Sequence, residues 1–408
     1  MPSLSMETNP YKSLTTIFDD ESVLMEGWSP QQLPERQDEL HEIRNALAPV
    51  TRGVNAHNLF IYGKTGQGKT VAVDYELNLL EEWASNEGEL DLSVIKISAH
   101  NQSTSYQLTS HLIKEIRGHS RKPSGIDQQS MFDLLYEELR KLNEKIVVVI
   151  DEIDSIGTSD ELLYELPRAR KNGYLQNQWI SVIGISNNLQ FRDNLSPKVK
   201  DSLYDSEIEF KPYGANQLES ILKRRAKQAF VDDVLTDGVI SLCSAFAAQD
   251  EGSARQAIKL LYKSGELALN NDSTEVREHH VRTGWDILER KRIEDGMRSL
   301  THQDRLALVS IVILESKDAT PARTKEVYKM YKMITNELES NQLVERRVRD
   351  HLQSLGMQGF IIAQIRKTGV QGGSHYVFEL RTNFDVTVDI LSETTEISDL
   401  LSNLTRCD

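Results

Sequence analysis

The sequence predicts three successive structural parts: an α/β domain built around a parallel sheet, a helical domain, and a small domain of three helices and a β-hairpin. Short apolar runs alternate with helical patterns up to about residue 214. Helical patterns alone follow as far as about residue 299. Three more helical patterns then precede two apolar runs that are separated by GVQGGS. We therefore expect domains at 1–214, 215–299 and 300–382, with an acidic tail at 383–408.

The first part contains five apolar runs that are rich in β-branched residues. In chain order they are NLFIY (58–62), SVIKISA (93–99), KIVVVI (145–150), ISVIGIS (180–186) and EIEF (207–210). Helical patterns such as TSYQLTSHLIKEI and SMFDLLYEELRKL lie between them. This alternation is typical of a parallel sheet with helices on its faces.

The second part is a succession of helical patterns, among them QLESILKRRAKQAF and SARQAIKLLYKSGELAL. In the third part the helical patterns are LALVSIVILES, TKEVYKMYKMITNEL and VERRVRDHLQSLG, and the strands are FIIAQIRKT and HYVFELRT. Three helices followed by a hairpin form the winged-helix arrangement, a variant of the helix-turn-helix. The polar and acidic stretch at the end predicts a loosely held tail.

The composition excludes a protein that is coated with basic residues for gripping polyanions, because the formal net charge is -15. The charge is uneven, however, since residues 300–380 carry two more basic than acidic residues. A nucleic acid would therefore bind in this segment. The general acidity has two open explanations, adaptation to a high-salt cytoplasm and an ordinary acidic surface.

The sequence also predicts a cytoplasmic protein without a membrane partner. No apolar run approaches the length of a membrane-spanning helix, and the first residues lack a basic segment followed by an apolar one. Cys243 and Cys407 lie far apart without a CxxC spacing or a neighbouring histidine, so we expect two reduced thiols.

The segment GKTGQGKT (63–70) predicts a nucleotide site, because it joins a strand to an amphipathic helix. Its glycines allow backbone N–H groups to close around phosphates, and the positive end of the helix adds to the attraction. Lys69 can reach the β and γ oxygens, and the Thr70 hydroxyl can bind Mg²⁺. The residues expected to bind the nucleotide in this loop are Thr65, Gly66, Gln67, Gly68, Lys69 and Thr70.

Acidic residues follow the apolar strand in VVVIDEID (147–154). Asp151 is placed to hold Mg²⁺ together with Thr70, and Glu152 to act as general base on the attacking water. A carboxylate in the second position is expected of enzymes that hydrolyse ATP. The alternative, acids that only cap the next helix, suits Asp154 better than Asp151 or Glu152.

Two further polar residues complete the predicted site. Asn187 ends ISVIGIS and would lie beside the γ-phosphate if this strand neighbours the strand of the phosphate loop; otherwise it is a turn residue. Arg255 lies in the first turn of a helix in EGSARQAIKLL, where it can reach back to the phosphates; otherwise it lies on a solvated helix face.

In this order, and followed by a winged helix, these segments resemble the archaeal replication initiators. These are AAA+ proteins related to the large subunit of the eukaryotic origin recognition complex and to the cell-division-cycle helicase loader. The resemblance extends from about Leu33, in LPERQDEL, to about Leu380. It implies a Walker A motif with Lys69 and Thr70, a Walker B motif with Asp151 and Glu152, sensor 1 at Asn187 and sensor 2 at Arg255.

The resemblance also implies the ligands and partners. ATP or ADP with Mg²⁺ would be the cofactor, and Tyr213 in FKPY and Arg225 in LKRRAKQAF would line the nucleotide. The partners would be double-stranded origin DNA, the replicative helicase and other initiator subunits, so the protein would be associated with the nucleoid. Residues 120–129 correspond to the insertion with which initiators touch DNA.

Two positions depart from the family's pattern. Lys198 in LSPKVK replaces an arginine proposed to act on a neighbouring subunit's nucleotide. Lysine keeps the charge but lacks the planar fork that clamps a γ-phosphate, which predicts weak stimulation of hydrolysis between subunits. The wing, VQGGSH, lacks the arginine expected between its glycines, although Gly372 and Gly373 can still approach the minor groove.

The best local sequence evidence for DNA binding is ERRVRDHL, which places Arg346, Arg347 and Arg349 in the opening turns of the third helix. This is the part of a recognition helix that enters the major groove, where arginines pair with phosphates or guanine edges. The alternative is a solvent-exposed helix face on which Glu345 and Asp350 balance the charges of the arginines.

Taken together, the sequence predicts a nucleotide-controlled replication initiator with weak ATPase activity, in which bound nucleotide fixes the lid and hydrolysis resets it. Two other classes stay open at this point. A motor or clamp-loader ATPase would need an effective arginine acting between subunits, which Lys198 argues against. A nucleotide-controlled transcription regulator would share the phosphate loop and the winged helix but would bind promoters.

Overall fold

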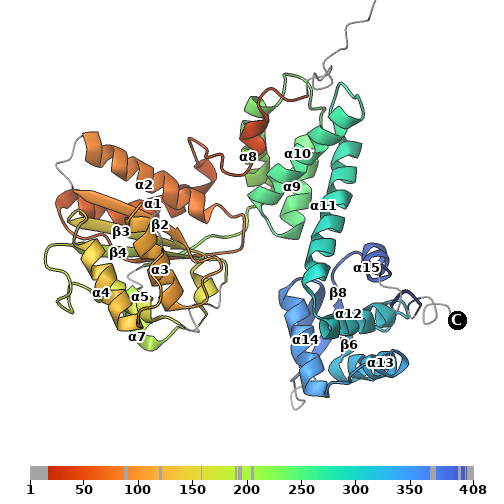
Figure 1. Cartoon of the computed structure of the whole chain (residues 1–408). Coiled ribbons are helices and arrows are strands. Elements are labelled where there is room, and N and C mark those ends of the chain that lie inside the picture. Colours follow the sequence, from red (N-terminus) through yellow and green to blue (C-terminus); the bar gives the residue numbers. More distant parts are fainter. Residues whose placement is uncertain are drawn as a thin grey trace, which may run out of the picture. The chain divides into compact units, whose positions relative to one another are not determined.

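The structure is a computed structural model of the whole chain (Figure 1). It describes residues 17–86, 91–118, 122–157, 159–188, 191, 195–203, 206–367, 374–393, 397–399 and 401. The chain divides into two compact units, Met1–Arg282 and Thr283–Asp408, and each is described by itself.

The first unit contains a five-stranded parallel sheet, as the sequence predicts. Its strands are β1 (Leu59–Tyr62), β2 (Leu92–Ser98), β3 (Lys145–Asp151), β4 (Trp179–Ser186) and β5 (Ser206–Glu209). Their order is β2-β3-β4-β1-β5, so β1 lies between β4 and β5. Tyr62 is in register with Ser186 of β4, which brings the residues that follow these two strands to the same edge of the sheet.

Helices cover both faces of this sheet (Figure 1). On one face lie α1 (Gln37–Leu47) and α2 (Lys69–Asn86), and on the other lie α3 (Ser105–Ile116), α4 (Gln128–Leu139), α5 (Glu161–Arg168) and α7 (Pro197–Leu203). Short 3₁₀ helices occur at η2 (Pro34–Arg36), η3 (Ala48–Arg52) and η4 (Ile153–Ile156). Because side chains alternate along a strand, β3 contributes Val148 to one core and Val149 to the other.

A helical lid completes the first unit, with α8 (Ala215–Ala229), α9 (Val239–Asp250) and α10 (Ala254–Asn270). The amino-terminal segment, which includes η1 (Glu21–Leu24), packs on this lid. Phe18 pairs with Phe230 through an antiparallel bridge, and their ring centroids are 4.8 Å apart. Helix α11 (Glu278–Ser299) follows and crosses the division between the two units.

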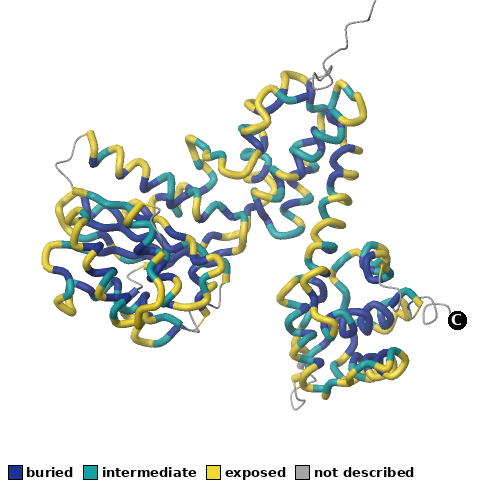
Figure 2. Tube along the Cα trace, in the orientation of Figure 1, coloured by how far each residue is buried: buried dark blue, intermediate teal, exposed yellow. Residues whose placement is uncertain are grey.

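The second unit is a winged helix, which confirms the predicted fold. It contains α12 (His302–Glu315), β6 (Ala322–Arg323), α13 (Thr324–Glu337), α14 (Glu345–Met357), β7 (Ile361–Lys367) and β8 (Ser374–Leu380). The antiparallel sheet has the order β6-β8-β7. Every residue from Leu306 to Leu314 of α12 is buried, so this helix forms the centre of the unit (Figure 2).

Helix α14 is fixed to α12 by a contact between His351 and Asp304. His351 Nδ1 lies 2.7 Å from Asp304 Oδ1, and the other oxygen of Asp304 accepts hydrogen bonds from Thr301 in a capping box. Burial opposes ionisation of this carboxyl group, but the hydrogen bonds from Thr301 and His351 outweigh it and lower the pKa of Asp304.

The expected loosely held tail at 383–408 is wrong for its first half. Residues Phe384–Leu391 form α15, which Asn383 caps, and Ile390, Leu391, Ile397 and Leu401 are buried in the core of the second unit. The acidic residues of FDVTVDIL lie on the exposed side, whereas its apolar residues recur at helical spacing. Composition alone therefore hid an amphipathic helix. Residues 402–408 lie outside the described residues.

Within the described residues no helix is long and apolar enough to cross a membrane.

Replacing Leu391 with alanine is expected to destabilise the second unit by about 2 to 4 kcal/mol, because the side chain is buried and its loss leaves a cavity. Urea unfolding followed by far-UV circular dichroism measures the change. Glu393→Ala, which removes an exposed side chain close by, is the control. Equal unfolding free energies for the two variants would show that α15 does not stabilise the unit.

Candidate nucleotide site and DNA-facing helix

The phosphate loop follows β1 and leads into α2, as the sequence predicts. Gly66 and Gly68 have φ angles of 79° and 85°, which belong to the left-handed region that other residues rarely adopt. The glycines therefore let the loop turn sharply so that α2 begins at Lys69, with its positive end facing the loop. Thr65 is exposed on this loop, whereas Gln67 is fully buried.

Lys69 is buried, and its ammonium group contacts three oxygen atoms. It donates hydrogen bonds of 2.8 Å to the carbonyl oxygens of Gly63 and Lys64 and to Oδ1 of Asn187. Burial lowers the pKa of Lys69 to about 8, and the nearby carboxylates of Asp151 and Asp154 only partly offset this. The ammonium group is therefore short of compensating negative charge, which phosphate oxygens would supply.

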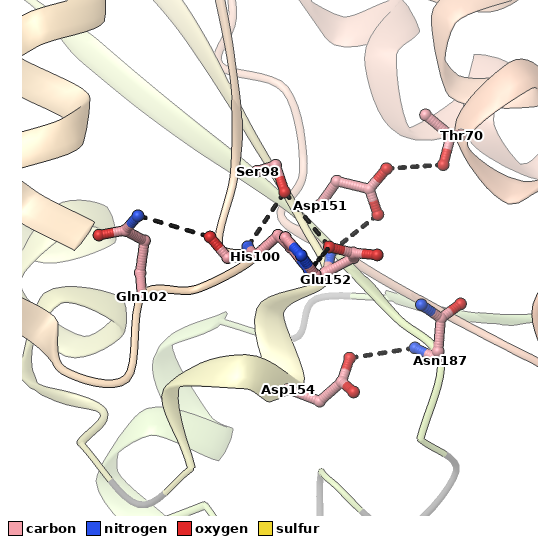
Figure 3. Close-up of polar contacts among 8 residues, drawn as sticks. All are labelled: Thr70, Ser98, His100, Gln102, Asp151, Glu152, Asp154 and Asn187. Atoms are coloured by element: carbon pink, nitrogen blue, oxygen red, sulfur yellow. Dashed lines mark hydrogen bonds and ion pairs between the residues drawn. The ribbon is translucent and has the colours of Figure 1, made fainter. Parts of the chain in front are cut away.

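Thr70 and Asp151 lie together at the edge of the sheet (Figure 3). The Thr70 hydroxyl donates a 2.7 Å hydrogen bond to Oδ2 of Asp151, and Oδ1 of Asp151 accepts one from the Glu152 N–H. In the part of the chain that the structure describes, no group of three or more His, Cys, Asp or Glu residues could hold a metal ion. Two hard oxygen ligands fit Mg²⁺, which commonly completes its coordination with phosphates and water.

Glu152 extends from the carboxyl end of β3, and it has a φ angle of 53° (Figure 3). Its carboxylate is about one-third exposed and lies 3.1 Å from Nδ1 of His100 and 3.4 Å from Oγ of Ser98. The Ser98 hydroxyl also accepts a hydrogen bond from the His100 N–H. His100 and Ser98 were not predicted as site residues. Ser98 lies in SVIKISA and His100 directly follows this run, so both come at the end of a strand; this position points to the site only once β2 is known to lie beside β3, because neighbouring parallel strands end at the same edge of a sheet.

Asp154 has a structural role, but it is not the helix cap that the sequence left open for it, since η4 has no side-chain cap. Its Oδ1 accepts a hydrogen bond of 3.1 Å from the Asn187 N–H (Figure 3). The same oxygen accepts a hydrogen bond of 2.9 Å from Ser186 Oγ. Asp154 thereby fixes the end of β4 and turns Asn187 towards the loop, where its side chain accepts the hydrogen bond from Lys69.

The lid touches the phosphate loop directly. The Ala254 N–H, at the start of α10, donates a 3.0 Å hydrogen bond to the carbonyl oxygen of Gly66. A Cβ atom at position 66 would overlap the Ser253 hydroxyl and would come within 3.2 Å of Cβ of Arg255. The Arg255 side chain therefore begins beside the loop. Because Arg255 is exposed, its side chain is available to a ligand there.

The structure brings Tyr213, but not Arg225, to the phosphate loop. Tyr213 is 4% exposed; its hydroxyl would be 2.8 Å from a Cβ at Gly68, and the Arg36 guanidinium lies 3.8 Å from its ring centroid. Arg225 stacks on Trp28 at 3.8 Å and donates a hydrogen bond to the Val23 carbonyl. Burial lowers the pKa of Arg225 to about 10.

The residues predicted to bind DNA lie on α14 or outside the described residues. Arg346 and Arg347 are exposed and Arg349 is half-buried in the first turns of α14, and none of them forms an ion pair with a described residue. Gly372 and Gly373 of the wing lie outside the described residues, as do Ser120 and Arg121 of the predicted insertion at 120–129. Lys198 is exposed on α7.

Comparisons with known proteins agree with this geometry. Residues 52–190 match the AAA domain, residues 219–286 the Cdc6 AAA+ ATPase-type lid domain, and residues 295–390 the C-terminal winged helix domain of CDC6. An ORC1-type DNA replication protein of Haloarcula marismortui is 40% identical over 387 residues, which are 93% of this chain and 95% of that protein. One from Thermococcus kodakarensis is 35% identical over 389 residues, with 93% and 91% covered.

A solved structure is also similar over nearly the whole chain. The Aeropyrum pernix ORC1 protein in complex with DNA superimposes with a TM-score of 0.77 at 34% sequence identity. The match covers 94% of this chain and 99% of that one.

Nucleotide affinity is expected to fall as the pH rises above about 8. Phosphate oxygens favour the charged ammonium and raise the pKa of Lys69, so binding takes up a proton in the range above the free value of about 8. The dissociation constant should be flat below that pH and increase up to tenfold per unit above it. Calorimetric titrations with ADP from roughly pH 7.5 to 9.5, where the phosphates are fully ionised, measure this.

The control for this pH dependence is Lys69→Arg, because arginine stays charged throughout the range and should bind with a flat profile. Affinity of the native protein that does not change up to roughly pH 9.5 would show that Lys69 is already charged before the nucleotide binds.

Gly66→Ala is expected to weaken nucleotide binding by about tenfold or more, because the methyl group would displace Ser253 and the start of α10 from the loop. Gly53→Ala is a matched control: Gly53 has a similar φ of 73°, but a Cβ there meets nothing within 4 Å. Both variants carry the same backbone strain, of about 1 to 2 kcal/mol. Calorimetry and urea unfolding of both separate the effects, and an equal loss of affinity would rule out the contact as the cause.

Proposed function

The chain belongs to the family of ORC1-type DNA replication proteins, and we propose that it initiates DNA replication by binding origin DNA under the control of bound ATP or ADP. The observation that carries this proposal is the hydrogen bond from Ala254 of the lid to Gly66 of the phosphate loop. Phosphates bound in the loop would lie against the start of α10 and the Arg255 side chain. The lid would therefore respond to which nucleotide is bound.

The nucleotide contacts are proposed for the residues that the structure gathers at the loop. Backbone N–H groups from Thr65 to Thr70 would bind the phosphates, and Lys69 would move its ammonium group from the loop carbonyls to the β and γ oxygens. Mg²⁺, held by Thr70 and Asp151, would neutralise charge that develops on the phosphates. Tyr213 would support the loop through its hydroxyl group, which lies close to Gly68, because Arg36 already covers its ring.

Hydrolysis is proposed to be slow. Glu152 would accept a proton from the attacking water, but here its carboxylate is in contact with His100, and this contact must loosen before Glu152 can act as base. Asn187 would leave Lys69 and orient the water instead. Lys198 lacks the fork of an arginine, so a neighbouring subunit would add little. The protein would therefore retain its nucleotide and work as a switch.

Origin DNA is proposed to contact α14. Arg346 and Arg347 are exposed in its first two turns, where a recognition helix meets base edges and phosphates. The names of the relatives favour an initiator over a clamp-loader motor or a transcription regulator, and the structure of an ORC1 protein with DNA supports DNA as the partner. We place the protein in the cytoplasm on the nucleoid, with the replicative helicase and other initiator subunits as further partners.

Genome-wide footprinting of the bound protein tests this proposal. Occupancy is expected at one or a few replication origins, and to depend on whether ATP or ADP is bound. Occupancy that is confined to promoters would instead identify a transcription regulator.

Arg346→Ala and Arg347→Ala are each expected to weaken binding to a footprinted site by about 1 to 3 kcal/mol if the arginine reads a base. If it contacts a phosphate instead, the slope of log affinity against log salt should fall by about 1. Fluorescence anisotropy at several salt concentrations measures both. Lys317→Ala, which removes an exposed charge just after α12, is the control. Native-like binding by both arginine variants would exclude α14 as the recognition helix.

A further inference from the structure

Arg36 is a buried arginine whose guanidinium group links segments that are far apart in the sequence. It is 3% exposed and lies at the end of η2, just before α1. Its Nε donates a 3.2 Å hydrogen bond to the carbonyl oxygen of Gln67 in the phosphate loop. Its Nη2 donates a 2.7 Å hydrogen bond to the carbonyl oxygen of Lys211, in the linker that joins β5 to α8. One planar group thus holds the loop and the beginning of the lid.

The linker between the sheet and the lid, residues 210–214, is held by further contacts around Arg36. The guanidinium carbon lies 3.8 Å from the ring centroid of Tyr213 and 5.1 Å from that of Phe210. The Tyr213 N–H donates a 3.0 Å hydrogen bond to the carbonyl oxygen of Gly252, which precedes Ser253 and α10. A change in lid position therefore moves the partners of Arg36.

The side chain of Gln67 faces the same linker. Neither its Nε2 nor its Oε1 has a hydrogen-bond partner, although the residue is fully buried. A Cβ at Gly63 would be 2.6 Å from Gln67 Oε1 and would overlap the Phe210 carbonyl oxygen, so these three residues are packed tightly. Two unpaired buried polar atoms cost free energy, so this conformation of the loop has a reason to change when a ligand arrives.

We propose that Arg36 is a positioning residue that couples the phosphate loop to the lid, by bonding the Gln67 and Lys211 carbonyl oxygens with one guanidinium group. A shift of the loop on nucleotide binding would pull on Lys211 and Tyr213 and so move the lid. A shift of the lid would in turn change how firmly the loop holds phosphates. This inference rests on the proposed function, since it describes how the nucleotide reaches the lid.

Arginine suits this role better than lysine. The guanidinium group is planar and presents its N–H donors in fixed directions, so that Nε and Nη2 can serve two carbonyls while the flat face stacks on Tyr213. Its third contact, from Nη1 to Glu39 at 2.6 Å, balances the charge. A lysine would keep the charge but could not hold both carbonyl oxygens and stack at once.

The test is a double-mutant cycle on the full chain, with the release rate of a fluorescent ADP analogue as the readout. Arg36→Lys is expected to speed release by about tenfold, the effect of one charge-assisted hydrogen bond. Arg255→Ala should also speed release by about tenfold in the native background but by less than threefold in the Arg36→Lys background, because the lid has then lost its link to the loop through Arg36. Glu39→Gln, which keeps both carbonyl bonds, should release ADP at nearly the native rate.

The outcomes separate this inference from the proposed function. Equal effects of Arg255→Ala in both backgrounds would overturn the coupling role, because a purely structural arginine gives additive effects. If Arg255→Ala left release unchanged in the native protein, the proposed contact of Arg255 with the bound phosphates would be wrong. In that case the test of the inference is Arg36→Lys alone. If this variant released the ADP analogue at the native rate, the inference would be overturned.

Discussion

The close approach of the lid to the phosphate loop is the constraint on which the rest of the first unit depends. Gly66 accepts a hydrogen bond from Ala254, and there is no room for a side chain between this glycine and Ser253. The start of α10 is thereby placed where phosphates would bind, and its helix dipole adds to the positive field of Lys69 and Arg255. Sheet, loop and lid must keep this fit, which explains why the linker after β5 is held by several contacts.

Unfavourable burial is concentrated at the same place. Lys69 is buried with its pKa lowered, Gln67 has an unpaired carboxamide, and Arg36 places a second positive charge near the first. Each of these features costs free energy in the protein alone. An anionic ligand would reduce the cost of the two positive charges, those of Lys69 and Arg36. A ligand that relieves such costs binds tightly and stabilises the state that holds it. The arrangement therefore favours retention of nucleotide over rapid exchange.

Residues whose position follows from their neighbours in the chain could be placed from the sequence. Lys69 and Thr70 follow from the loop motif, and Asp151 follows from its place at the end of a buried strand. The contact of Asn187 with Lys69 required only that β4 lie beside β1, as it does. By contrast, the contacts of Arg36 join residues 31 and 175 positions apart, which no local pattern indicates. His100 was missed because its contact with Glu152 depends on β2 lying beside β3, and the order of strands in a sheet is not visible in the sequence of either strand.

The acidity of the chain limits how its winged helix can bind DNA. With a net charge of -15, the protein as a whole repels the phosphate backbone, so attraction has to come from a few local arginines. Arg346 and Arg347 lack ion-pair partners among the described residues, and their charge is therefore available to DNA. Few phosphate contacts mean weak nonspecific binding and a modest dependence on salt. Selection of a DNA site must then depend on base contacts and on the proposed control of the lid by nucleotide. When nonspecific binding is weak, such control has its largest effect on how much of the DNA site is occupied.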